Sequence, residues 1–407
     1  MGERWRGTIA SMNRDLKLLA GAAGVSALGD FLAVLPLVVH VQAKTGSALA
    51  VSAVFFALWG PLVLAAGVAG SIVDRFENRA LLVGVSFGQA VCVAGIALTV
   101  DHLWIALPLL ALTGFCAAIG QPAEFALVPA AAGEGELARA NGLMETLRAL
   151  GFTAGPLLGG LLGAAGLLRL ALVIDALSFI AVGLAALALR ARRRPVTAHA
   201  RVRAREGFSF LARDRALAIT LGGAIAALTV FTMSATAEPF FVMDVLGAGS
   251  AGYGLLITAW TLGMTVGAAG LAHRVSRSAP AVVALTAIVA QGLGIVGTAA
   301  SPVLWTALLG FAFGGVAHGL KNVLLRTLIH ERVPEALRGR AFAAYNGARN
   351  GAELGALALG GLVVGAFGAR VALLASGLGP ALIGLACLLF LTTPTLQRRT
   401  IDARVHG

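Results

Sequence analysis

Long runs of apolar residues alternate with short polar or charged segments along the whole chain. Each run is roughly 20 residues or longer, the length that an α-helix needs to cross a lipid bilayer. The pattern therefore predicts an all-α membrane protein with twelve transmembrane helices. We expect these helices at residues 16–41, 48–72, 80–100, 102–127, 139–163, 169–190, 216–244, 250–272, 279–299, 303–328, 340–365 and 370–393.

Composition supports the membrane assignment. Of the 407 residues, 58% are hydrophobic and 12% are charged, and the mean hydropathy is +0.89. Soluble domains carry about 25% charged residues. The three cysteines, Cys92, Cys116 and Cys387, all fall inside predicted spans without the spacing of a metal site, so neither a disulfide nor a metal is expected.

The net charge of +12 would suggest nucleic-acid binding in a soluble protein, but its distribution indicates membrane topology. With both ends of the chain on one side, that side holds 24 of the 31 lysines and arginines. The opposite loops hold three, and four lie inside spans. Because basic residues are enriched in cytoplasmic loops, both termini are expected in the cytoplasm, with no role in nucleic-acid binding.

The spans divide into two related halves. A basic segment at 191–215 separates a six-helix half at 1–190 from a second at 216–407 with a short cytoplasmic tail, and it reads as a cytoplasmic linker. A shift of 201 residues places Arg139 on Arg340, Arg148 on Arg349, Gly159–Gly160 on Gly360–Gly361 and Arg169 on Arg370. Such pseudo-repeats are typical of transporters, whose substrate site lies where the halves meet.

The loop between the second and third spans carries the first motif, "GVAGSIVDRFENR" at 67–79. It resembles the loop signature of the major facilitator superfamily. The resemblance implies the major facilitator fold and a conformational latch formed by Gly70, Asp74, Arg75 and Arg79, which closes the cytoplasmic side in one state. The alternative is a charged turn that obeys the positive-inside rule.

The fifth span carries the second motif, "GFTAGPLLGG" at 151–160. Its glycines form a small-residue face for close helix packing, and its proline removes a backbone hydrogen bond and can bend the helix. It resembles the motif of the superfamily's antiporters, which are mostly drug exporters. The resemblance assigns the motif to Gly151, Gly155, Pro156, Gly159 and Gly160. Ordinary glycine-rich packing is the alternative.

Ionisable residues inside spans are functional candidates, because a charge in hydrocarbon costs about 2.5–3.5 kcal/mol or more. Asp30 has no basic neighbour within a helical turn and is the first candidate for the proton carrier, followed by Glu238 and Glu124. Asp175 with Ser178 reads as a structural pair.

Two further pairs share a helix face by their spacing. Glu145 with Arg148 and Arg349 with Glu353 can partly neutralise each other, in a structural or a transport role. Drug antiporters often carry an arginine on the fourth helix; this chain has Glu124 there, so either Arg148 supplies that charge or the coupling differs.

Polar and aromatic residues of the spans are candidates to line the substrate cavity, although any one of them could face lipid instead. They are Phe55, Trp59, Gln121, Phe152, Trp260, His318, Lys321, Asn322, Tyr345 and Asn346.

The leading hypothesis is a bacterial inner-membrane exporter of hydrophobic or cationic small molecules, such as drugs and antibiotics, by proton antiport with alternating access. It needs the proton gradient but no cofactor, its partners are a small molecule, protons and the bilayer, and the family default is a monomer. The alternative is uptake or export of a specific metabolite, siderophore or lipid. An enzyme is not expected, because the sequence has no HExxH motif and no paired His/Asp cluster of a metal site.

Overall fold

The computed structural model describes residues 13–132, 135–193, 204–271 and 279–393. The described residues are helical and contain no strand. Within this described part of the chain, eleven helices are long and apolar enough to cross a membrane, and a bent pair, α3 (Ala48–Leu64) with α4 (Ala66–Arg75), brings the number to as many as twelve. The predicted all-α fold is confirmed.

The chain divides into two compact units. Unit 1 comprises Met1–Arg201, Ala235–Thr261 and Leu357–Ala369, and unit 2 comprises Val202–Ser234, Leu262–Ala356 and Arg370–Gly407. The predicted halves follow chain order, whereas these units place parts of the seventh, eighth and eleventh spans in unit 1. Residues 194–203 of the predicted linker lie outside the described part of the chain.

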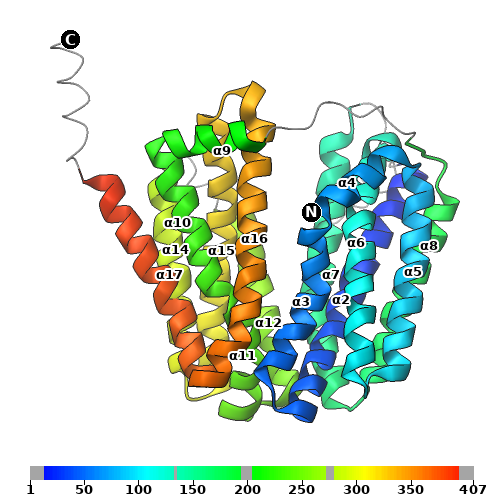
Figure 1. The fold of residues 1–407 in the computed structure, drawn as a ribbon, viewed down its shortest axis with the longest axis horizontal. Coiled ribbons are helices and arrows are strands. Elements are labelled where there is room, and N and C mark those ends of the chain that lie inside the picture. The colour runs from blue at the N-terminus through cyan, green and yellow to red at the C-terminus, as the bar shows by residue number, and fades with distance from the viewer. Residues whose placement is uncertain (1–12, 133–134, 194–203, 272–278, 394–407) are drawn as a thin grey trace. The chain divides into compact units, whose positions relative to one another are not determined.

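Unit 1 is built mainly from upright helices that pack side by side (Figure 1). Besides α3 and α4, they are α2 (Arg14–Thr45), α5 (Asn78–Thr99), α6 (Leu103–Ala132), α7 (Leu137–Ala164) and α8 (Leu168–Ala188). Helix α2 packs against α7 and α8, α5 packs against α6 and α8, and α3 packs against α6. Leu16, Leu127 and Met144 are fully buried in one of its apolar clusters.

The seventh and eighth spans are irregular. Their elements are α10 (Arg215–Thr232), α11 (Ser234–Phe240), the π-helical turn η1 (Phe241–Val245), α12 (Gly249–Val266) and a second π-turn, η2 (Gly267–Leu271). Turn η1 begins two residues after Pro239. Proline cannot donate a backbone hydrogen bond, so regular α-helical pairing is weakened near it.

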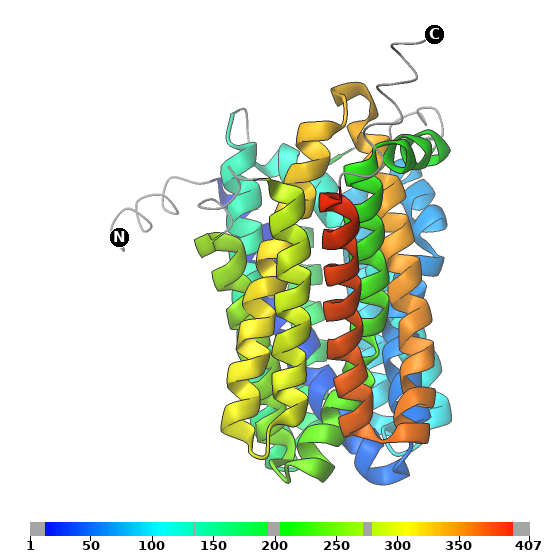
Figure 2. The ribbon, with the colours of Figure 1, turned by 90° about the vertical axis from the view of Figure 1, so that its left-hand side faces the viewer.

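Unit 2 contains α9 (Ala204–Arg213), α14 (Pro280–Ala300), α15 (Leu304–Arg332), the first part of α16 (Glu335–Phe367), and α17 (Ala369–Thr392). Helix α9 lies across the ends of the upright helices of this unit (Figure 1). Helices α14 and α15, yellow-green and yellow, run side by side (Figure 2). Leu217, Leu285 and Leu324 are buried in the apolar core of this unit.

Large apolar side chains also cover the outside of the helices. Leu98 is 83% exposed and Leu309 is 73% exposed. On a soluble protein such a surface would favour aggregation, but around membrane-spanning helices it is the surface that lipid covers. The chain is therefore a multi-pass membrane protein.

A charged cluster joins three segments at one end of unit 1. Asp101, between α5 and α6, contacts Lys44 Nζ at 3.0 Å and Arg169 at 3.1 Å. Lys44 lies in the last turn of α2 and Arg169 in the first turn of α8. The hydrogen bond and the charge of Lys44 hold the pKa of Asp101 below its ordinary value.

Candidate transport site

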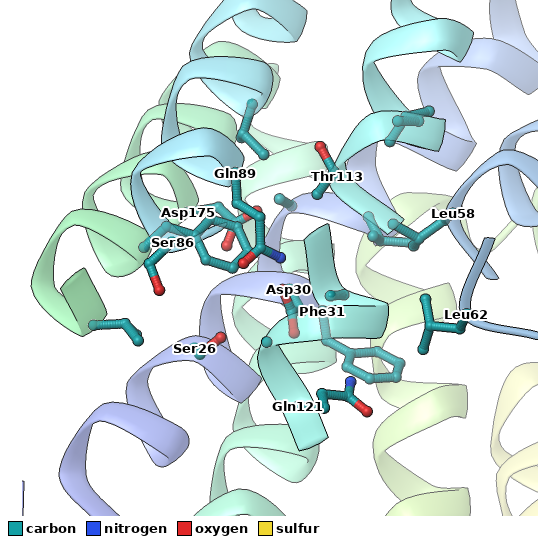
Figure 3. A pocket seen from close by; sticks show the side chains of 18 of the residues that line it. Ser26, Asp30, Phe31, Leu58, Leu62, Ser86, Gln89, Thr113, Gln121 and Asp175 are labelled. Carbon is teal, nitrogen blue, oxygen red and sulfur yellow. The ribbon is translucent and has the colours of Figure 1, made fainter. Parts of the chain in front are cut away.

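Unit 1 encloses a cavity of about 190 Å³. Six helices of this unit line it, namely α2, α3, α5, α6, α7 and α8. Figure 3 shows polar side chains from α2, α5, α6 and α8 turned toward it. Its polar and ionisable lining residues are Ser26, Asp30, Ser86, Gln89, Thr113, Gln121, Glu124 and Asp175. The cavity combines an apolar wall with several polar groups, as small-molecule sites do.

Asp30 lies midway along α2 and lines this cavity. Its carboxylate forms no hydrogen bond or ion pair with another described residue. The charges of Arg148 and Glu124 act on it electrostatically. Asp30 is therefore an ionisable group in a membrane-spanning unit whose carboxylate oxygens have unused hydrogen-bonding capacity.

Asp175 on α8 lies in the same cavity as Asp30, and the two carboxylates interact electrostatically. Ser178 Oγ donates a hydrogen bond to Asp175 Oδ1 at 3.3 Å, which confirms the pair expected from the spacing. A Cβ at Gly29 would lie 2.5 Å from Asp175 Oδ1 and 2.5 Å from Ser178 Oγ. The absence of a side chain at Gly29 lets α8 bring Asp175 next to α2.

Glu124 and Arg148 form a buried ion pair between α6 and α7. The Arg148 guanidinium donates to Glu124 Oε2 at 2.5 Å, and it lies 4.5 Å from the ring centroid of Phe125. Both charged side chains are at most 15% exposed. The expected pairing of Arg148 with Glu145 is wrong, because Arg148 binds Glu124, and Glu145 is exposed and forms no ion pair with a described residue.

Glu124 also has an oxygen without a partner. Oε1 is buried and accepts no hydrogen bond from any described group, while Oε2 is held by Arg148. Since Glu124 lines the cavity, that oxygen is a ready acceptor for a donor entering it.

The glycines of the fifth-span motif do bring helices into close contact. A Cβ at Gly151, Gly155 or Gly159 would lie 2.7–2.8 Å from a backbone atom of α2. A Cβ at Gly160 would lie 2.8 Å from Gly254 on α12, also in unit 1. The small-residue face is confirmed, and α7 continues as one helix through Pro156.

Among the residues of the expected latch, Arg79 contacts the end of another helix. A Cβ at Gly70 would meet no described atom within 4 Å, so no close helix approach depends on it. Asp74 and Arg75 are exposed and bind no other described residue. Arg79 alone holds a helix end, since it donates to the backbone carbonyls of Ala186 and Leu187 at the end of α8. The gating role of this motif stays a prediction.

Unit 2 contains a second set of buried ionisable groups. The expected pair of Arg349 with Glu353 is confirmed at 2.9 Å on α16. On α15, His318 and Lys321 are buried and contact Gln291 of α14. Their geometry is treated below.

The other cavity candidates are dispersed. Trp59, Gln121 and Phe152 line the unit 1 cavity, and Phe55 is buried beside it with its ring stacked on Trp59 at 5.1 Å. The remaining candidates lie elsewhere: Glu238 is buried on α11, Trp260 is half-buried on α12, Asn322 and Tyr345 are half-buried in unit 2, and Asn346 is exposed.

No group of three or more His, Cys, Asp or Glu among the described residues has the arrangement of a metal site. The cavity therefore offers hydrogen-bonding and ionisable groups but no metal ligand set within the described chain.

The comparison with known families decides the family. The sequence model of the Major Facilitator Superfamily matches residues 19–236 and, a second time, residues 219–405. Together the two matches span nearly the whole chain. The chain belongs to the Major Facilitator Superfamily.

Two similar proteins are named as enterobactin exporters. The chain is 30% identical over 375 residues to the enterobactin exporter EntS of Salmonella choleraesuis strain SC-B67, covering 87% of this chain and 86% of the relative. It is 28% identical over 377 residues to EntS of Escherichia coli O81, and this alignment covers 89% of this chain and 88% of the relative.

Solved structures of superfamily-like transporters share the fold. The nucleoside transporter NupG aligns with a TM-score of 0.75 at 14% identity, over 93% of this chain and 100% of that chain. A POT family transporter in complex with 5-aminolevulinic acid aligns with a TM-score of 0.76 at 9% identity, over 93% and 96%. The fold and the relatives are those of membrane transporters rather than enzymes.

Sequence reasoning missed several polar residues of this superfamily member's cavity. Ser86 and Gln89 stand three residues apart in the otherwise apolar third span, and Thr113 lies in the fourth. The i, i+3 spacing of Ser86 and Gln89 places both on one helix face and was an available signal. Thr113 offered none, because a lone threonine in a span usually bonds its own helix, as Thr113 does to the Leu109 carbonyl.

Proposed function

We propose that this protein exports a small molecule across the bacterial inner membrane in exchange for protons, and that Asp30 carries the proton. Its exporter relatives support the direction of transport. The close-packed glycine face of α7 supports it as well, through the resemblance of this stretch to the antiporter motif.

The observation that carries the proposal is the free carboxylate of Asp30 in the unit 1 cavity. Protonated, Asp30 is neutral and can remain in a water-poor site at little cost; ionised, it attracts a cation or a hydrogen-bond donor. A single group that accepts either a proton or the substrate couples the two by competition. Arg148, which reaches α6 through Glu124, supplies the positive charge that the fourth span itself lacks.

The first candidate substrate is a siderophore, because relatives that align over most of the chain are enterobactin exporters. The second candidate is a cationic drug, which the carboxylates of the cavity favour. Both are exported by the same mechanism in this proposal.

The test uses proteoliposomes with an imposed pH gradient, loaded separately with enterobactin and with the cationic dye ethidium. We expect the wild-type protein to move at least one of them against its gradient. Asp30→Asn should abolish this gradient-driven transport while its melting temperature stays near that of the wild type.

The matched control is Glu136→Gln, which neutralises a surface carboxylate that pairs with Arg139 at the start of α7. It should transport like the wild type. Gradient-driven accumulation at the wild-type rate by Asp30→Asn would overturn the assignment of Asp30. Antiport would be overturned if the wild-type protein moved the substrate only down the substrate's own concentration gradient, at a rate independent of the pH gradient.

A further inference from the structure

Unit 2 buries a lysine without a carboxylate partner. Lys321, midway along α15, is 4% exposed and forms no ion pair with any described residue. Its neighbours are Gln291 on α14, at 2% exposure, and His318 one turn earlier on α15, at 8%. A buried ammonium without a counterion is costly, and lysine readily becomes neutral in such a setting.

The three side chains form a closed triangle of polar contacts. Lys321 Nζ donates to Gln291 Oε1 at 3.0 Å and lies 3.2 Å from His318 Nδ1. His318 Nδ1 in turn lies 3.2 Å from Gln291 Oε1. Each atom of the triangle is therefore within hydrogen-bond distance of the other two.

Counting hydrogens shows that the triangle fits the neutral amine. A neutral amine has two N–H groups and one lone pair, and its two N–H groups match the two acceptors present, Gln291 Oε1 and His318 Nδ1. If the imidazole hydrogen instead lies on Nδ1, that hydrogen can donate to Oε1 or to the amine lone pair. An ammonium has three N–H groups, and the third finds no acceptor among the described residues.

The surrounding charges oppose each other. Arg349 and Glu353, both on α16, act electrostatically on Lys321, the first against its positive charge and the second in favour of it. On α10, the ring of Phe231 has its centroid 5.8 Å from that of His318. Any change in the distance of Arg349 or Glu353 from Lys321 therefore changes the balance between ammonium and amine.

We propose that Lys321, with His318 and Gln291, is a second proton-binding site of this protein, located in unit 2. In this step the ammonium of Lys321 releases one proton to water and becomes the amine that the triangle satisfies. Rebinding of one proton from water restores the ammonium. No other bond is made or broken, and Asp30 is not involved in the step.

The site is tested directly by nitrogen NMR of the lysine side chains. The chain has only three lysines, Lys17, Lys44 and Lys321. Replacing Lys17 and Lys44 by arginine leaves Lys321 as the one signal in protein labelled with [ζ-15N]lysine, in detergent or nanodiscs. We expect this signal to pass from the ammonium to the amine shift as the pH is raised over the range in which the protein stays folded.

Charge variants sharpen the measurement. Glu353→Gln removes the negative charge that favours the ammonium and should move the transition to lower pH. Glu335→Gln is the matched control on the same helix, since Glu335 is exposed at its first residue and should leave the transition unchanged.

An ammonium signal at every pH at which the protein stays folded would overturn the proposal, and so would an amine signal throughout. Equal effects of Glu353→Gln and Glu335→Gln would also overturn it. The measurement uses no transported substrate, so its failure leaves the proposed export untouched, and failure of the transport assay leaves this site untouched.

Discussion

Midway along α2, unit 1 has Asp30, whereas the repeat-related position on α10 of unit 2 is Phe231. The reverse holds on the fourth and tenth spans. Ala117 and Gly120 of α6 line the unit 1 cavity, and their counterparts on α15 are His318 and Lys321. Duplicated helices thus carry acidic groups around a cavity in one unit and a basic cluster in the other.

The repeat-related arginines, Arg148 and Arg349, differ in the helix that supplies their carboxylate partner. Arg148 pairs with Glu124 from α6, but the counterpart of Glu124 on α15 is Leu325, so Arg349 pairs with Glu353 on its own helix. The positive charge has stayed in place while its partner changed helix. The comparison teaches that the two units share an arginine at the repeat-related position but differ in its partner and in the ionisable groups around it.

The two arginine pairs should differ most in their contribution to stability. Glu124→Gln leaves a buried guanidinium uncompensated, and we expect it to lower the free energy of unfolding by about 3–5 kcal/mol. Glu353→Gln breaks a more exposed pair within one helix and should cost about 0.3–0.5 kcal/mol. Denaturant unfolding in detergent measures both, and the double variant Glu124→Gln with Arg148→Gln should recover part of the loss. Equal losses from the two single variants would contradict the comparison.

Alanine substitutions of glycines on α7 and on α16 should also differ in their effect on stability, but by less than the two arginine pairs do. A Cβ at Gly159 meets the Leu32 carbonyl of α2 at 2.7 Å, so Gly159→Ala should destabilise the protein by about 1–3 kcal/mol. Gly355 on α16 has no neighbour within 4 Å, and Gly355→Ala should stabilise by up to about 1 kcal/mol, because alanine favours the helix. Melting temperatures of the two variants check this, and a stabilising Gly159→Ala would show that α2 and α7 are not closely packed.

The smallest expected difference between the units is in the pH dependence of stability at two repeat-related arginines, Arg169 and Arg370. Arg169 binds the Asp101 carboxylate, whereas Arg370 donates to the Ser301 carbonyl at 3.3 Å. Because the pKa of Asp101 is lowered in the folded protein, its stabilising effect is complete above the unfolded value of about 3.9 and is lost as the pH falls through the lowered pKa.

Asp101→Asn should therefore lower the melting temperature slightly at neutral pH and not at strongly acidic pH. The contact of Arg370 with the Ser301 carbonyl does not titrate in this range, so its loss in Arg370→Gln should have the same small effect at both pH values. Melting curves at the two pH values distinguish the variants, and a pH-independent effect of Asp101→Asn would contradict the role of its charge.

The sequence by itself predicted what depends on local order along the chain. The apolar runs predicted the membrane spans, and the i, i+4 spacing predicted the pair of Arg349 with Glu353. Helix geometry fixes such neighbours before any helix packs against another. The glycine face of α7 followed from the same periodicity, although the helix that it contacts did not.

The tertiary structure alone decided which residues of different helices meet. Arg148 had a possible partner one turn away in Glu145 and binds Glu124 of α6 instead, because the packing buries Glu124 beside Arg148 and leaves Glu145 exposed. Asp175 joined Asp30 in the cavity because Gly29 lets α8 approach α2. Lys321 met Gln291, thirty residues earlier in the chain, through the packing of α14 on α15. These contacts depend on the rotation of each helix about its axis, which the hydrophobic pattern of a membrane helix specifies only weakly, since lipid and protein interior are both apolar.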